Sequence, residues 1–220
     1  MIFDLQFAVS LLPELGRGLV VTVQATLGGM ALALTLGLAA ALARRSRRRW
    51  VAWPAGLAVE FVRSTPLLVQ LYFLFYVLPS AGIQFSAFTT GVLALGVHYA
   101  AYCAEVYRAG LETVPRGQWE AATALNLTRW QAYRRVVLPQ AVPPVVPALG
   151  NYLVAMFKDT PLLSAITVLE LLQRAKLIGA ETFRYVEPLT LVGLAFLLVS
   201  LVAAAGVRAL ERRWNMGTAA

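Results

Sequence analysis

Long runs of apolar residues, separated by short polar stretches, dominate this chain. A helix needs about 20 apolar residues to cross the hydrocarbon core of a bilayer. Five runs reach or approach this length, and they lack the apolar/polar alternation that membrane-barrel strands require. The pattern therefore predicts an all-α integral membrane protein with five transmembrane helices, at about 19–43, 61–79, 88–106, 141–157 and 189–207.

The polar stretches between the runs predict shorter elements. Residues 1–18 carry acids and no basic leader, so we expect an outer interfacial segment without a cleaved signal, followed by one transmembrane domain over 19–213. In the long connection 158–187, Thr160 is placed to cap a helix with Pro161 in its first turn. This helix is predicted to end before Gly179 and to lie partly re-entrant or on the outer surface.

Composition and charge support a membrane protein and orient it. Hydrophobic residues make up 59% of the chain and charged residues only 14%, against about 45–50% and about 25% in soluble domains. With an outer N-terminus, the inner segments 44–53, 107–140 and 208–220 hold 13 basic and three acidic residues, and the outer segments five and six. Basic residues favour the cytoplasmic side, so the N-terminus is predicted outside and the C-terminus in the cytoplasm. One cysteine and one histidine exclude an intrachain disulfide and argue against a multi-ligand metal site.

The inner stretch 107–139 is polar yet patterned like two short helices. Residues 117–125 have high helix propensity, and Asn126 is suited to the left-handed conformation that ends a helix. Thr128 and Gln131 have the spacing of a capping box, which predicts a second helix over 129–137 that stops at Pro139. The sequence thus predicts a bent elbow on the cytoplasmic side, with alanines that leave room for another protein.

These residues resemble a known motif. Glu120-Ala121-Ala122, followed by Leu138-Pro139 with the Pro 19 positions after the Glu, resembles the EAA motif in membrane subunits of bacterial ABC importers. Asn126 stands where that motif has glycine, and asparagine tolerates the same backbone conformation. Segments 61–70, 104–110, 114–118 and 158–164 are similar to the polar amino acid permeases, the histidine/glutamine/arginine/glutamate group. The resemblance covers residues 18–213.

The resemblance implies a type I ABC importer-like fold and a set of partners. These are a cytoplasmic ATP-binding cassette subunit, a second permease subunit in a homo- or heterodimer, and an extracytoplasmic amino acid-binding protein. It places the protein in the bacterial cytoplasmic (inner) membrane. The coupling helix would be 117–126, and its ATPase-coupling residues would be Gln118, Glu120, Ala121, Ala122, Ala124, Leu125 and Asn126. The alternative is an amphipathic interfacial hairpin without a partner.

The sequence contains no G-x-x-x-x-G-K-[ST] loop for holding nucleotide phosphates. We therefore expect no directly bound cofactor, with ATP and Mg used by the partner ATPase. An intramembrane enzyme is the alternative from another class, but the single histidine and the missing G-x-S-x-G elbow argue against a serine hydrolase. A passive scaffold would leave the bent segment unexplained.

Polar residues within the apolar runs are candidates for a substrate pathway, because such residues usually face a partner or an aqueous cavity. Glu60 and Arg63 are three apart and can simply pair, whereas Pro66 breaks its span beside Gln70. His98, Tyr102 and Glu105 form one helical stripe. For each of them, packing is the alternative to a pathway role. The candidates are Arg63, Thr65, Gln70, His98, Tyr102, Glu105, Lys158 and Asp159.

Five arginines occupy six positions at 44–49. Membrane orientation and attraction to anionic lipid headgroups suffice to explain this run. We expect contact with the lipid bilayer and no nucleic-acid partner.

Overall fold

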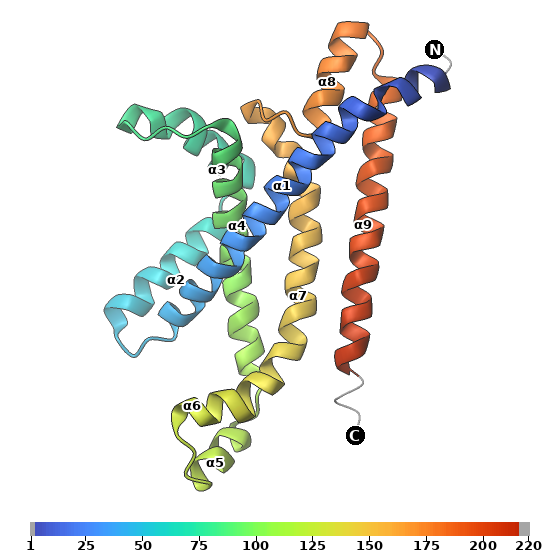
Figure 1. Cartoon of the computed structure of the whole chain (residues 1–220). Helices are drawn as coiled ribbons and strands as arrows, with labels where there is room; N and C mark the ends of the chain where they lie inside the picture. The colour runs from blue at the N-terminus through green and yellow to red at the C-terminus, as the bar shows by residue number, and fades with distance from the viewer. Residues whose placement is uncertain (1–2, 216–220) are drawn as a thin grey trace.

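The computed structural model describes residues 3–215, and every regular element in this range is helical (Figure 1). Three helices are long and apolar enough to cross a bilayer on their own, and two further candidate spans are bent pairs of helices. The five predicted spans thus correspond to three continuous helices and up to two broken ones. In chain order the elements are α1 (Leu5–Arg44), α2 (Arg49–Arg63), α3 (Leu67–Tyr72), the π-turn η1 (Phe73–Val77), the 3-10 turn η2 (Leu78–Ala81), α4 (Ala87–Glu112), α5 (Arg116–Ala124), α6 (Arg129–Ala132), the π-turn η3 (Tyr133–Val137), α7 (Leu138–Asp159), the 3-10 turn η4 (Thr160–Ile166), α8 (Leu171–Thr182) and α9 (Val186–Asn215).

Helix α1 is continuous where the sequence predicted two parts. The Asp4 carboxylate caps it by accepting from the Phe7 N–H at 3.1 Å, and the helix then runs for 40 residues. At 1.5 Å per residue this is about 60 Å, twice the thickness of the hydrocarbon core. The boundary expected at residue 18 is therefore wrong, because one helix includes both the outer segment and the span. Residues 1–2 of that segment and 216–220 of the predicted inner tail lie outside the described residues.

The second span differs most from its predicted limits of 61–79. Helix α2 begins at Arg49, and a break after Arg63 turns the chain by 104° into α3. Pro66 explains the break, because it lacks an N–H and disfavours the helical conformation in the residue before it. Only residues 61–63 of the predicted span belong to α2, and the rest of the span follows the break in another direction.

The elbow and the helices that follow it confirm some predictions and correct others. Thr128 and Gln131 form the predicted capping box, and Asn126 has a φ of 51°. The stop at Pro139 is wrong, because α6 continues through η3 into α7 as far as Asp159. The wide π-turn directly before Pro139 accommodates a residue without an N–H.

The helix expected to start at Thr160 is also wrong in its limits. The Thr160 hydroxyl donates to the Phe157 carbonyl at 2.7 Å, and a short 3-10 turn follows in place of a helix. Thr167 ends this turn in the left-handed conformation. Glu170 then caps α8 with its carboxylate, which accepts from two backbone N–H groups, and α8 runs past Gly179.

Small residues bring α1 and α4 together at the centre of the molecule (Figure 1). A Cβ atom on Gly37 would lie 2.7 Å from Cβ of Cys103 and 2.8 Å from the Ala100 carbonyl, so only glycine allows this approach. Around this crossing, Leu71, Leu95 and Met156 form a buried core with residues of α7 and η4. The elbow and the end of α9 lie at one end of the molecule, and the start of α1 and α8 lie at the other (Figure 1).

Candidate functional site

The elbow, defined as residues 116–137, projects from the end of the helical body where α4 and α7 meet (Figure 1). Helix α4 leads into it through Thr113–Pro115, and α7 continues from it without a break. Its position is therefore tied directly to these two long helices.

A small core of its own holds the elbow rigid. Val114, Val137 and Ala141 are buried together, and the rings of Trp119 and Tyr133 pack edge to face at 5.2 Å on the side of this core. Aromatic pairs of this geometry stabilise packing beyond the area they bury. The two short helices are thus packed as one unit with the ends of α4 and α7.

The predicted coupling residues fall into two groups. Ala122 is buried at 3% exposure and packs inward. The others are exposed, and Leu125 presents 73% of its surface. Glu120 is the fifth residue of α5, and its carboxylate forms no ion pair within residues 3–212. The exposed residues are Gln118, Glu120, Ala121, Ala124, Leu125 and Asn126.

A cluster of charges joins α1, α2 and α4 close to the elbow. Glu105 forms ion pairs with Arg44 of α1, with Arg63 of α2 at 3.6 Å and with Arg108 at 2.8 Å. Arg63 also lies 3.7 Å from Glu60, as their spacing predicted. Because three arginines already surround Glu105, this carboxylate is occupied by protein contacts.

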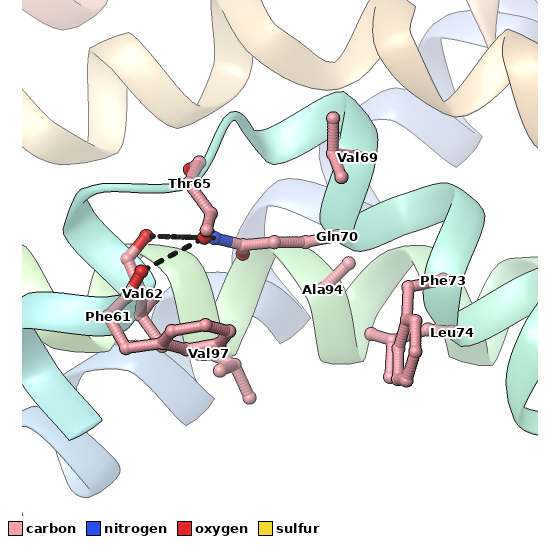
Figure 2. Close-up of a pocket in the computed structure, with 9 residues that line it drawn as sticks. All are labelled: Phe61, Val62, Thr65, Val69, Gln70, Phe73, Leu74, Ala94 and Val97. Carbon is pink, nitrogen blue, oxygen red and sulfur yellow. Dashed lines mark hydrogen bonds between the residues drawn. The ribbon is translucent and has the colours of Figure 1, made fainter.

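Gln70 closes the break between α2 and α3 (Figure 2). Its amide nitrogen lies 2.8 Å from the Val62 carbonyl and 2.7 Å from the Thr65 hydroxyl. Val62 is four residues before Pro66, so its carbonyl is the one that the proline leaves without a helical donor. The amide oxygen lies 3.3 Å from Nδ1 of His98. Gln70 therefore replaces the missing backbone hydrogen bond and joins the break to α4.

Beside the break lies a cavity of about 280 Å³ with an almost entirely apolar wall (Figure 2). Phe61, Val69, Phe73 and Val97 contribute to its lining. The polar atoms of Gln70 are engaged by the chain itself, so this cavity offers little to a charged group.

A second polar cluster lies between α4 and α7. The Tyr99 hydroxyl donates to Oδ2 of Asp159 at 2.7 Å, and within residues 3–212 Oδ1 accepts no hydrogen bond. The rings of His98, Tyr99 and Tyr102 lie 5.2 to 6.1 Å from one another, and the Tyr152 ring lies 6.0 Å from Tyr99 and 5.6 Å from Tyr102. The arrangement combines aromatic faces with a carboxylate oxygen that can accept a hydrogen bond from a cation.

The structure brings most of the predicted pathway residues together. Arg63 lies over the Tyr102 ring at 5.6 Å, which links the Glu105 cluster to the aromatic one. Lys158 is the exception, because its side chain lines a separate groove with Phe196 and Ser200 of α9. Thr65, Gln70 and His98 form one group at the break, and Tyr102 connects them to Asp159 through Tyr99.

Three contributors escaped the sequence reasoning. Tyr99 and Tyr152 lie within apolar runs, where aromatic residues are common. The only local signal for Tyr99 is its position next to His98. Arg44 belongs to the arginine run that was assigned to membrane orientation. It is separated from Glu105 by 61 positions, a distance that no local pattern bridges.

Comparisons with known proteins agree with this architecture. The profile of a family described as "Binding-protein-dependent transport system inner membrane component" matches residues 33–216. A protein of Sinorhizobium fredii named "Probable amino-acid ABC transporter permease protein y4tG" is 51% identical over 94% of this chain and 90% of its own length. The "L-cystine transport system permease protein TcyB" of Bacillus subtilis is 36% identical over 91% of this chain and 88% of its own.

A solved structure also matches. The "Crystal structure of an amino acid ABC transporter with histidines" superposes with a TM-score of 0.92 at 35% identity, covering 97% of this chain and all of the other. A structure of the MetNI methionine ABC transporter has a TM-score of 0.72 at 21% identity and supports the fold alone.

Proposed function

This chain belongs to the family of binding-protein-dependent transport system inner membrane components, and from that membership we propose that it is the transmembrane subunit of an ATP-driven amino acid importer. Two such subunits form the translocation pathway in the bacterial cytoplasmic membrane. A separate ATP-binding cassette subunit uses ATP and Mg, and an extracytoplasmic binding protein delivers the amino acid.

The observation that carries this proposal is the connection of the elbow to α4 and α7. The Tyr99–Asp159 hydrogen bond and the Tyr102–Tyr152 contact both connect α4 to α7. A displacement of the rigid elbow is therefore transmitted to both walls of the aromatic cluster. When the ATPases close and move the elbows, the walls shift and the pathway alternates between outward and inward access.

Asp159 is the best placed candidate for contact with substrate. An amino acid presents an ammonium group that needs acceptors, and Oδ1 of Asp159 is available for one. Glu105 and Gln70 are saturated by partners within the chain. We expect Asp159→Asn to weaken amino acid binding to the purified complex by at least about tenfold, the cost of one charge-assisted hydrogen bond. Unchanged binding in this variant would remove Asp159 from the pathway.

The coupling role is tested by reversing the charge of Glu120. Like charges placed together at an interface cost several kcal/mol, so Glu120→Lys should reduce co-purification of the ATPase by at least about tenfold while membrane expression persists. Glu211→Lys is the matched control, because Glu211 is also exposed and belongs to α9, whose end lies at the same end of the molecule as the elbow (Figure 1). Equal ATPase recovery with Glu120→Lys and Glu211→Lys would contradict the assignment of the elbow as the docking site.

A further inference from the structure

The turn between α1 and α2 carries five arginines, and they divide into two kinds. Arg44 points into the protein and pairs with Glu105. The other four have exposed side chains, and within residues 3–215 none of them forms an ion pair. These four, called here the arginine turn, are Arg45, Arg47, Arg48 and Arg49.

No acid of the neighbouring sequence compensates this charge. From residue 44 the chain has no aspartate or glutamate until Glu60, and Glu60 is close to Arg63. The arginine turn therefore presents four positive charges and their guanidinium forks outward. Such forks bind phosphate oxygens in bidentate fashion.

An apolar stripe continues from the arginine turn along α2. Trp50 and Trp53 expose 72% and 70% of their surfaces, and Leu57 and Phe61 extend the same face at helical spacing. Val59, on the opposite side of α2, is buried at 4% exposure and packs against α1 and α4. Arg48 stacks over the Trp50 ring at 5.8 Å. Tryptophans beside basic residues are typical of the level where lipid headgroups meet acyl chains.

We propose that the arginine turn and the Trp50–Trp53 face form a binding site for anionic phospholipid, in which the arginines hold the phosphodiester and the tryptophan stripe contacts the acyl chains. Charge complementarity selects this occupant. A second copy packed symmetrically on this face would bring two arginine turns together, and a nucleic acid would leave the apolar continuation through Leu57 and Phe61 without a partner.

The site predicts a measurable preference between lipids of equal chain length. An arginine near an anionic surface gains attraction equivalent to about a fivefold change in a binding constant. We therefore expect phosphatidylglycerol to be preferred over phosphatidylcholine at this face by at least about fivefold. The preference should fall as salt is raised, because exposed charges are screened.

The tryptophans of the site serve as the reporter. In a full-length variant carrying Trp119→Phe, Trp130→Phe and Trp214→Phe, only Trp50 and Trp53 fluoresce. This parent is reconstituted into phosphatidylcholine vesicles that contain, at equal mole fraction, either dibrominated phosphatidylglycerol or dibrominated phosphatidylcholine as quencher. Stronger quenching by the brominated phosphatidylglycerol is the expected result.

Two variants of this parent separate a site from a general charge effect. Replacing the four residues of the arginine turn by glutamine should abolish the preference. The matched control removes four exposed arginines from the elbow, as Arg116→Gln, Arg129→Gln, Arg134→Gln and Arg135→Gln, and should retain it.

Three results would overturn the proposal: equal quenching by both lipids in the parent, a preference that survives in the arginine-turn variant, or an equal loss in the elbow control. If the four-fold variant does not fold, Arg47→Gln with Arg49→Gln must still reduce the preference, and an unchanged value in that pair would also contradict the site. ATPase and substrate play no part in this measurement, so its outcome is independent of the proposed transport function.

Discussion

Replacing Gln70 by methionine tests whether this residue repairs the break in the second span. Methionine matches the length of glutamine but provides no amide. The Val62 carbonyl and the Thr65 hydroxyl lose a donor at 2.8 and 2.7 Å, and His98 loses its partner at 3.3 Å. At about 1 kcal/mol net for each hydrogen bond, the two short ones and the longer contact together amount to about 2–3 kcal/mol.

This loss is large enough to measure as a shift in the melting temperature. For a chain of about 200 residues, 1 kcal/mol corresponds to about 2–4 °C, so Gln70→Met should lower the Tm by about 4–12 °C in thermal unfolding of the full chain in detergent. Gln118→Met is the matched control, because the side-chain contact of this exposed elbow glutamine is a weak one at 3.4 Å. Thr65→Val combined with Gln70→Met should cost less than the sum of the two single changes, since both remove the same hydrogen bond.

Two other outcomes would contradict this role of Gln70. If Gln70→Met melts like the control while substrate binding to the complex falls, Gln70 is a ligand-contacting residue and the break is held by other groups. If the double variant is strictly additive, Thr65 and Gln70 do not cooperate.

Two further predictions concern the elbow and the start of α1. Asn126 has a φ of 51°, so Asn126→Val should lower the stability of the bend by about 1–2 kcal/mol and speed hydrogen exchange over 117–127. Asn126→Gly should leave this exchange unchanged. Similar exchange in both variants would contradict the left-handed bend. The hydrogen bond from the Phe7 N–H lowers the pKa of Asp4 below its ordinary value of 3.8, with Arg184 acting in the same direction. A lowered folded-state pKa stabilises the cap above about pH 4, and this contribution is lost as the pH falls through the folded value. The first turn of α1 should therefore lose protection against hydrogen exchange below pH 3.8. In Asp4→Ala the exchange of this turn should not change with acid in this way.

Local signals in the sequence were sufficient for the three to five candidate spans and for the bend of the elbow. The bend depends on Asn126 and on the Thr128–Gln131 capping box, and both act within a few residues. Pro66 likewise marked the break in the second span, because its effect on the helix is local.

Errors arose where a local signal had two structural outcomes. Pro139 looked like a helix stop, but the π-turn before it allows the helix to continue. Thr160 looked like a cap, yet it bonds back to Phe157 while the buried carboxylate of Glu170 performs that role ten residues later. Long-range contacts such as Tyr99–Asp159 depend on which helices pack together, and no periodicity within one helix specifies that.

In the proposed function, the elbow transmits work from a separate ATPase to the pathway between α4 and α7. Its most direct test is amino acid uptake into proteoliposomes that contain this subunit with its partner permease, binding protein and ATPase, with ATP supplied on the elbow side. The account predicts uptake that requires ATP, disappears with Glu120→Lys and persists with Glu211→Lys. Uptake of equal rate without ATP hydrolysis, or with an ATPase that no longer contacts residues 116–127, would contradict it.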